Sequence, residues 1–207
     1  IYIYMINIIP LFPKVVLTAR LDLSVNKTQE LQNYSDSFDY IHCNDDPLAC
    51  LQSKELHVLN KKLNLKKIFL QKIESMLAST IAQQTPMQIT TSWFIKARPN
   101  EGSDYHTHAN CMLSAVYYWN NESGNKIYFE SHNKSAWFVE HNQLNVYNST
   151  EWWVETQNDL LVILPAELSH KVGINKGTRI RNCLAMNLIP VGKFGRNDCT
   201  LNMPKLK

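Results

Sequence analysis

The stretch DYHTHANCMLSAVYYW, residues 104–119, places two histidines just before an apolar run that ends in two tyrosines and a tryptophan. His106 and His108 are two residues apart. On an extended strand such residues point to the same face, with their Cα atoms about 6.5 Å apart. Two imidazoles at this spacing can reach one metal ion with bonds of about 2.1 Å. A bare His-x-His pair is a weak signal, so the rest of the chain decides its meaning.

The chain from residue 87 onward has the composition of an all-β core. Short segments rich in β-branched and aromatic residues alternate with Asn, Gly and Asp, as expected for antiparallel strands joined by turns. The segments are MQITTSWFIKA (87–97), CMLSAVYYW (111–119), NKIYFES (125–131), SAWFVEH (135–141), WWVET (152–156), DLLVILP (159–165), HKVGI (170–174) and IRNCLAMNLI (180–189). They predict a mainly β sandwich or barrel, with the two-sheet jelly roll as one candidate.

The residues before this core are expected to support it. Residues 6–23 read as an N-terminal strand, and residues 26–51 are polar and turn-rich without a strong period. Between residues 54 and 84, apolar residues recur at three- and four-residue steps, which predicts a helical layer. The 207 residues therefore predict a single domain. Its expected parts are the N-terminal strand and helical support (1–86), the jelly-roll core that carries the candidate site (87–192) and a C-terminal tail (193–207).

Composition narrows the class of protein and its partners. A net charge of +3 is too small to argue for a nucleic-acid partner. The apolar N-terminus, residues 1–16, lacks a basic segment and a cleavage site and is too short to span a membrane, so no membrane partner is expected. The five cysteines include no Cys-x-x-Cys pair, which predicts a reduced, cytoplasmic chain. A disulfide between Cys43 and Cys50 is the alternative.

Three further residue types give the His-x-His pair a context. His170 follows a nearly pure apolar strand and a proline-containing bend, where it can be held rigidly at the mouth of a barrel. Arg179 and Arg181 precede another apolar strand and, being two apart, are expected to share a face. A buried arginine needs an anionic partner, and that strand offers no acidic residue, so a carboxylate ligand is expected. Tyr118 can add a hydroxyl to the same anion.

In this order of histidines and arginine, the chain resembles the 2-oxoglutarate- and Fe(II)-dependent oxygenases. That superfamily has a double-stranded β-helix core, a His-x-Asp/Glu pair, a distal His, and an Arg about ten residues later that binds the C5 carboxylate of 2-oxoglutarate. The closer likeness is to a small branch found in marine bacteria and phages. It is strongest over residues 93–187. The motifs that carry it are LFP (11–13), SWF (92–94), HTHANCMLSAVYYW (106–119), VILPAELSH (162–170) and RNCLAMN (181–187).

The resemblance implies an iron site. His106, His108 and His170 fall on the metal positions, so Fe(II) is the expected metal. His108 stands where the superfamily usually has a carboxylate, so the ligands would be three neutral histidines. Asp104 is the alternative ligand if the register of the strand differs.

The resemblance also implies a cosubstrate site and an activity. Arg181 falls on the 2-oxoglutarate position, Arg179 is the reserve candidate, and Tyr118 matches a position that often touches the cosubstrate carboxylate. The expected activity is hydroxylation of an unidentified substrate, with release of succinate and CO2. The location would be the cytoplasm, or the host cytoplasm if a phage encodes the chain. The sequence allows a homodimer without indicating one.

Two other classes of function remain open from the sequence. One is a cupin-like three-His metal protein that binds a small anion or acts as a dioxygenase without 2-oxoglutarate. The other is a β-sandwich binding module without a metal. Tryptophans offer no further assignment, although Trp153 and Trp137 are candidates for lining a substrate groove.

Overall fold

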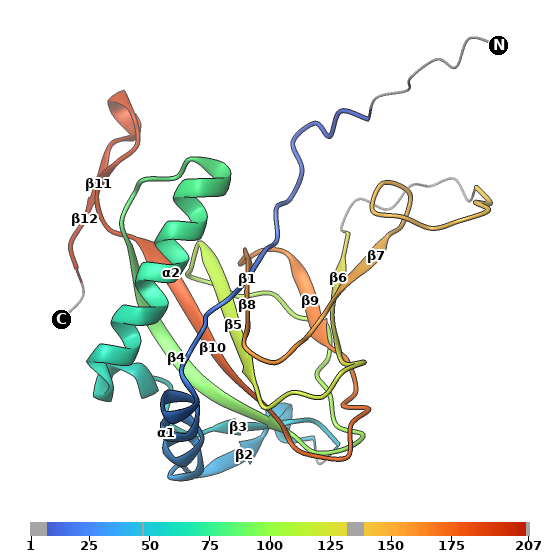
Figure 1. The fold of residues 1–207 in the computed structure, drawn as a ribbon. Helices are drawn as coiled ribbons and strands as arrows, with labels where there is room; N and C mark the ends of the chain where they lie inside the picture. Colours follow the sequence, from blue (N-terminus) through green and yellow to red (C-terminus); the bar gives the residue numbers. More distant parts are fainter. Residues whose placement is uncertain (1–7, 47, 132–138, 206–207) are drawn as a thin grey trace.

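The computed structural model describes residues 8–46, 48–131 and 139–205, and its core is two antiparallel sheets packed face to face (Figure 1). The strands of the large sheet are β1 (Leu17–Arg20), β2 (Tyr40–His42), β3 (Leu51–Ser53), β4 (Met87–Ala97), β5 (Leu113–Trp119), β8 (Leu160–Pro165) and β10 (Arg181–Pro190). The strands of the small sheet are β6 (Lys126–Glu130), β7 (Glu151–Glu155) and β9 (Ser169–Val172). The strand orders are β1-β8-β5-β10-β4-β3-β2 and β7-β6-β9.

Between β4 and β10 the chain winds back and forth between the two sheets, as in a jelly roll. β4 and β5 lie in the large sheet, β6 and β7 in the small one, β8 in the large, β9 in the small, and β10 returns between β4 and β5. His106 joins the small sheet through an antiparallel bridge to His170. The predicted fold class, mainly β with a jelly-roll core, is confirmed.

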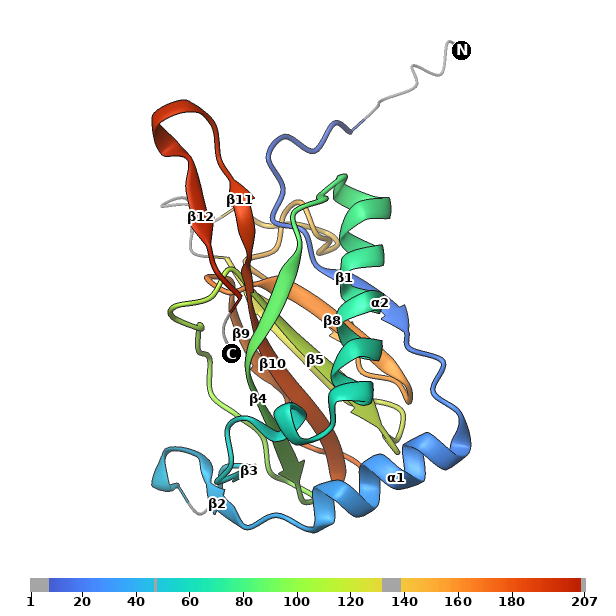
Figure 2. The same cartoon turned by 90° about the vertical axis from the view of Figure 1, so that its left-hand side faces the viewer.

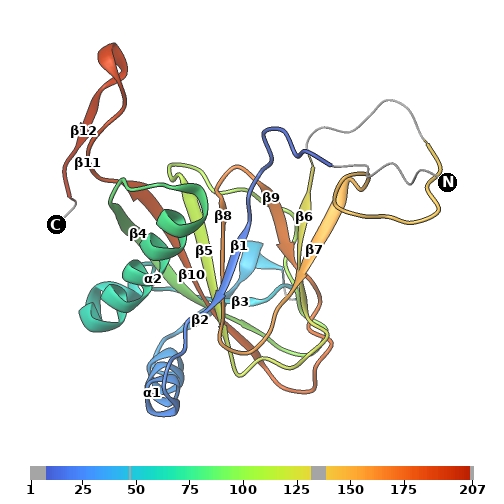
Figure 3. The same ribbon diagram turned by 45° about the horizontal axis from the view of Figure 1, so that its top comes forward.

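The large sheet is buried on both faces, and alternate residues of each strand belong to different cores. All seven residues of β5 are buried, as expected for a strand covered on both sides. The outer face packs against the helices α1 (Val25–Asp36) and α2 (Leu63–Ile81), which lie on the side opposite the small sheet (Figure 3). The outer core includes Phe69, Ile73, Phe94, Tyr117, Trp119 and Leu184. The inner core, between the sheets, includes Val116, Tyr118, Phe129, Leu168, Cys183 and Ala185.

The two helices differ in how clearly the sequence predicts them. The three- and four-residue steps of residues 54–84 correspond to α2, preceded by the short 3₁₀ turn η2 (Val58–Lys61). The polar segment 26–51 gives no periodic signal, yet it contains α1, β2, β3 and the 3₁₀ turn η1 (Cys43–Asp45). The side chain of Ser24 caps α1 by accepting from the Lys27 N–H, but only Leu31 and Ser35 of this helix are buried. So narrow a buried stripe leaves no amphipathic pattern to detect.

The predicted strands of the core agree with the structure in all but one segment. Seven of them correspond to β4, β5, β6, β7, β8, β9 and β10. SAWFVEH falls largely on residues 132–138, outside the described residues, and residues 139–141 form no strand. The N-terminal strand is shorter than expected, because only Leu17–Arg20 pairs, with β8.

The C-terminal residues form an unpredicted hairpin of β11 (Gly192–Phe194) and β12 (Leu201–Met203), which projects from the end of β10 (Figure 2). Its turn holds the 3₁₀ turn η3 (Asn197–Cys199). The division of the chain at residues 86 and 192 stays a prediction. Across the described ranges, no helix is long and apolar enough to cross a bilayer.

Candidate functional site

Three histidines from distant parts of the chain meet beside the small sheet. The possible ligand atoms of His106, His108 and His170 all lie within 4.8 Å of one another. Nε2 of His108 and Nε2 of His170 are 3.3 Å apart. Two nitrogens bound at right angles to one metal, with bonds of about 2.1 Å, would be about 3.0 Å apart. The His108–His170 pair therefore needs little closure to hold a metal ion.

Backbone hydrogen bonds hold the three histidines in place. His106 and His170 exchange both N–H···O bonds of their bridge, each 3.0 Å long. The His108 N–H donates to the Ala166 carbonyl at 2.9 Å. The loop before β5 is thus fastened to β9 and to the bend before it, so the spacing of the rings is set by the sheet and not by flexible side chains.

Further hydrogen bonds determine the tautomers of two rings. Nδ1 of His106 lies 2.8 Å from the Asp104 carbonyl, and Nδ1 of His170 lies 2.8 Å from the Leu168 carbonyl. Because a carbonyl oxygen only accepts, each Nδ1 carries a proton and each Nε2 keeps its lone pair. A histidine that donates its other N–H to a carbonyl is the common arrangement at metal centres.

The protonation states of His108 and His170 also suit metal binding. Burial lowers the pKa of His108 to about 4, and the charge of neighbouring His106 adds to this effect. Burial also lowers the pKa of His170 to about 4, although its bond to the Leu168 carbonyl acts in the opposite direction. Both rings are therefore neutral near pH 7, as metal ligands must be. His106 is exposed, so the cluster opens to solvent on its side.

The alternative ligand, Asp104, does not join the cluster. Its side chain is exposed, and its backbone carbonyl supports the His106 ring. Within the described part of the chain, the one group of three or more possible ligands consists of the three histidines and contains no carboxylate.

Arg181 lies at the start of β10, on the face that looks toward the small sheet, and is only 3% exposed. Its Nη1 donates to the Gly173 carbonyl at 2.8 Å and to Asn125 Oδ1 at 3.3 Å. Gly173 directly follows β9, so the guanidinium lies close to the strand that carries His170. Both acceptors are neutral, and no carboxylate pairs with Arg181 among the described residues. A buried cation with such partners favours binding of an anion.

Tyr118 lies on the same inner face, on β5, and is fully buried. Its hydroxyl has no hydrogen-bond partner in the ranges that the structure describes. Burial raises the pKa of this hydroxyl, nearby Cys183 raises it further, and the charge of Arg181 opposes the rise. Leaving a buried hydroxyl unpaired is costly, and this hydroxyl is free to donate to a ligand atom.

Arg179 lies elsewhere. β10 begins only at Arg181, so Arg179 belongs to the preceding loop, and the expectation that the two arginines share a face is wrong. The Arg179 side chain is 72% exposed, and its Nε lies 3.4 Å from Glu122 Oε1. The Arg179 N–H also donates to Glu122 Oε2, at 3.0 Å. This ion pair holds Arg179 at the surface.

Two tryptophans near the site have no assignment from the sequence. The ring of Trp93, on β4, lies 5.9 Å from the ring of His108. Trp152 pairs with Phe129, which also pairs with His170, but the Trp152 ring stacks on the ring of Trp153, with the ring centres 4.7 Å apart. Side chains alternate between the two faces of a strand, but the sequence does not show which alternate set of each strand faces inward.

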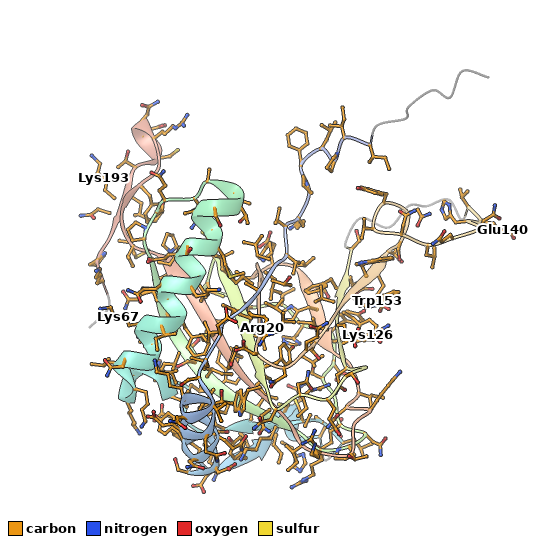
Figure 4. All side chains as sticks on the ribbon, in the orientation of Figure 1. Arg20, Lys67, Lys126, Glu140, Trp153 and Lys193 are labelled. Carbon is orange, nitrogen blue, oxygen red and sulfur yellow. The ribbon has the colours of Figure 1, made fainter. Side chains whose placement is uncertain are left out.

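The aromatic residues that the sequence does single out lie elsewhere. Trp153 is on the outer face of the small sheet, where Lys126 Nζ lies 4.2 Å from its ring centre (Figure 4). Trp137 falls outside the described residues. Thr91 Oγ1 and Asn187 Oδ1, from residues that pair across β4 and β10, are further buried atoms that have no partner among the described residues.

Comparisons with known proteins agree with this geometry. Residues 91–187 match the model of a family described as "Putative 2OG-Fe(II) oxygenase". This span contains the three histidines, Tyr118 and Arg181. No curated protein matches the sequence. The likeness to a branch from marine bacteria and phages stays a prediction.

Solved structures of several oxygenases and related enzymes share the fold. SnoK, an alpha ketoglutarate dependent carbocyclase from nogalamycin biosynthesis, is 10% identical with a TM-score of 0.63, over 94% of this chain and 84% of SnoK. A Pseudomonas putida prolyl-4-hydroxylase is 13% identical with a TM-score of 0.55, over 86% and 94%. HygX from Streptomyces hygroscopicus, solved with nickel, 2-oxoglutarate and hygromycin B bound, is 11% identical with a TM-score of 0.54, over 86% and 83%.

At these identities the structural likeness shows the fold alone, and the family model adds the sequence pattern of the region that holds the site. The chain is therefore similar to the 2-oxoglutarate- and Fe(II)-dependent oxygenases in sequence over residues 91–187 and in fold over most of its length.

Proposed function

We propose that this protein is an Fe(II)- and 2-oxoglutarate-dependent dioxygenase that hydroxylates a substrate still to be identified and releases succinate and CO2. One observation carries the proposal. Three histidines converge beside the small sheet, and among the described residues the same inner face holds a buried arginine with neutral partners only and a buried tyrosine hydroxyl with no partner. Together these groups can bind a metal ion and a dicarboxylate next to each other.

The donor set fits iron. Imidazole nitrogens are suitable ligands for Fe(II), and His106, His108 and His170 would hold it through Nε2 of at least the two rings whose Nδ1 is committed to a carbonyl. Three neutral ligands leave the double positive charge of the metal unbalanced, which favours a dianionic cosubstrate. When bound, the iron and 2-oxoglutarate supply the oxidative chemistry, and the chain supplies binding, orientation and exclusion of water.

The inner face fits the cosubstrate. Arg181 would bind the remote carboxylate of 2-oxoglutarate, and Tyr118 would donate its hydroxyl to the same group. Apolar neighbours such as Val116 and Ala185 keep this region dry, which strengthens the interaction between the guanidinium and the carboxylate. HygX, which shares the fold, was solved with a metal and 2-oxoglutarate bound, and this supports the same ligands here.

Hydroxylation is the proposed outcome because it is the default reaction of the superfamily, although a carbocyclase and an epimerase also share the fold. The cytoplasmic location and a homodimer remain predictions.

Turnover of 2-oxoglutarate tests the proposal directly. The purified chain with Fe(II), ascorbate and O2 is expected to form succinate from 2-oxoglutarate, and His170→Ala is expected to form none. His141→Ala, which changes an exposed histidine away from the cluster, is the matched control. Binding of Fe(II) without 2-oxoglutarate binding or succinate formation would contradict the proposal.

That outcome would favour the second candidate, a cupin-like three-His metal protein that works without 2-oxoglutarate. The observation on its side is that the cluster contains no carboxylate ligand. A metal-free binding module is the least supported class, because the fold does not require three imidazoles, two of them with fixed tautomers, to converge.

A further inference from the structure

Away from the histidine cluster, two thiols face each other across the β2–β3 hairpin. Cys43 directly follows β2 and Cys50 directly precedes β3. His42 pairs with Leu51, and the Cys43 N–H donates to the Cys50 carbonyl at 2.9 Å, so the antiparallel register continues to the two cysteines. Residues directly opposite on such a pair present their side chains to the same face. The two Sγ atoms are 3.4 Å apart.

The surroundings make the two sulfurs chemically unequal. Cys43 is half-buried, whereas Cys50 is only 4% exposed. The hydrogen bond between the thiols lowers the pKa of Cys43 and raises the pKa of Cys50. Because the thiolate is the nucleophile, the more accessible Cys43 is the sulfur that reacts first, and Cys50 lies in position to react with the product.

We propose that Cys43 and Cys50 form a reversible disulfide, which makes this hairpin a redox-sensitive modification site beside the candidate active site. The sulfurs must approach each other by about 1.4 Å to reach the bond length of about 2.05 Å. Rotation about the side-chain bonds can supply this movement, since the hairpin already holds the residues opposite each other.

Hydrogen peroxide is the oxidant class that the step requires. The Cys43 thiolate attacks one peroxide oxygen, the O–O bond breaks, and the departing hydroxide takes up a proton, leaving a sulfenic acid on Cys43. The Cys50 sulfur then attacks the Cys43 sulfur, the S–S bond forms, and the hydroxyl leaves as water with the proton of Cys50. Two thiols and one hydrogen peroxide thus give one disulfide and two waters, and a dithiol reductant reverses the change by exchange.

The thiol pair adjoins the arginine assigned to the cosubstrate. Leu51, next to Cys50, pairs with Lys96 on β4, and the following residue, Ala97, pairs with Arg181. If the register continues by one residue, Cys50 lies opposite Ala97, and only the small Ala97 side chain separates the Cys50 thiol from the Arg181 guanidinium. The charge of Arg181 acts on the Cys50 thiol, as expected at this spacing.

The same thiol also borders the loop that carries the first two histidines. The Cys50 N–H donates to the Gly102 carbonyl at 3.0 Å. On its other side Gly102 lies against β9 so closely that a Cβ there would be 3.1 Å from the Val172 carbonyl oxygen. Movement of Cys50 toward Cys43 can therefore displace both the loop that carries His106 and His108 and the side chain of Arg181. This part of the inference rests on the proposed function: we expect the disulfide to weaken 2-oxoglutarate binding.

Peptide mapping tests the disulfide without reference to any activity. No Lys or Arg lies between Lys27 and Lys54, so trypsin leaves both thiols in one peptide, residues 28–54. After peroxide treatment of the full chain and alkylation, we expect this peptide to carry no alkyl group and to be lighter by two hydrogens than the unmodified dithiol peptide. Dithiothreitol should restore two alkylation sites. Cys43→Ser should leave Cys50 open to alkylation, and Cys199→Ser, at an exposed cysteine, should behave as wild type.

The opposite result is equally definite. If peroxide that fully oxidises Cys199 leaves both hairpin thiols alkylatable, the proposed disulfide is wrong.

Calorimetry with 2-oxoglutarate, on chain freed of peroxide before metal is added, tests the coupling. The oxidised wild type should bind several-fold more weakly, and Cys43→Ser should not respond to the same treatment. A complete disulfide with unchanged affinity would overturn the coupling. Absence of 2-oxoglutarate binding in both redox states would overturn the proposed function and leave the mapping result intact.

Discussion

Tyr117 and Tyr118 are neighbours on β5 and both are fully buried, yet their hydroxyls have opposite surroundings. Tyr117 points toward the helices and donates to Asp159 Oδ1 at 2.8 Å. Tyr118 points toward the small sheet, and its hydroxyl has no partner in the described residues. Burial is the largest cause that raises the pKa of each hydroxyl. Since native proteins rarely leave buried polar groups unpaired, the difference between the two hydroxyls agrees with the proposal that a ligand binds on the inner face.

Other polar groups of the large sheet show the same tendency less strictly. On the outer face, Trp119 Nε1 donates to Gln32 Oε1 at 2.9 Å, which ties the sheet to α1, although Asn182 Oδ1 on that face is buried without a partner among the described residues. On the inner face, Thr91 Oγ1 and Asn187 Oδ1 are buried without partners in the same ranges. Substitutions on the outer face should therefore lower stability and spare binding, whereas those on the inner side should lower binding and spare stability.

The largest expected effect is the loss of the metal from the histidine cluster. His106→Ala should lower the affinity for Fe(II) by about 100-fold or more, because removing even a partner of a ligand costs about 10- to 100-fold. His106 is exposed, so its removal should change the melting temperature little. Competition with a chromophoric chelator under anaerobic conditions measures the affinity, with His141→Ala as control. Equal Fe(II) affinity in the two variants would show that the histidine cluster is not the metal site.

The next effect separates the two arginines. Arg181→Gln should raise the Kd for 2-oxoglutarate about 10- to 100-fold, since a hydrogen bond to a charged group contributes about 1.5–3 kcal/mol. Glutamine can still donate to the Gly173 carbonyl, which limits the loss of stability. Arg179→Gln should leave the Kd nearly unchanged, because Arg179 is held at the surface by Glu122. Calorimetry measures both, and a larger effect at Arg179 would reverse the assignment.

The sequence predicts the two faces unevenly. Alternation of β-branched and aromatic residues is enough to find β4 to β10, and the order of histidines and arginine is enough to find the inner-face groups. The phase of a strand is harder to predict, because it depends on where pairing starts. For that reason the sequence singled out Trp153, on the outer face of the small sheet, and did not single out Trp93 as a groove residue, although its ring lies 5.9 Å from the ring of His108. The proximity of Cys43 and Cys50 depends on a hairpin of two three-residue strands, too short to give a pattern.

On the outer face, Asp159 should matter for stability alone. It accepts from the Tyr117 hydroxyl and, at 2.9 Å, from the Asp22 N–H, so it joins β5 to the segment after β1. Asp159→Asn keeps the size of the side chain and tolerates the positive φ of 62° at this position. We expect a loss of about 2 kcal/mol in the free energy of unfolding, because an amide replaces one acceptor by a donor. Denaturant titration measures this loss. A change in 2-oxoglutarate affinity under conditions where the variant is fully folded would show that the two faces are not independent.

The smallest effect tests the contrast between the two tyrosines directly. Tyr117→Phe should cost about 1 kcal/mol of stability, because Asp159 loses a buried donor, and should leave the Kd for 2-oxoglutarate unchanged. Tyr118→Phe removes a hydroxyl that has no partner in the described part of the chain, so stability should stay the same or rise slightly. Its Kd for 2-oxoglutarate should rise about 5-fold, which corresponds to the loss of one hydrogen bond of about 1 kcal/mol. If both variants lost stability equally and both bound 2-oxoglutarate as wild type does, the unpaired hydroxyl would mark a defect of packing and not a ligand site.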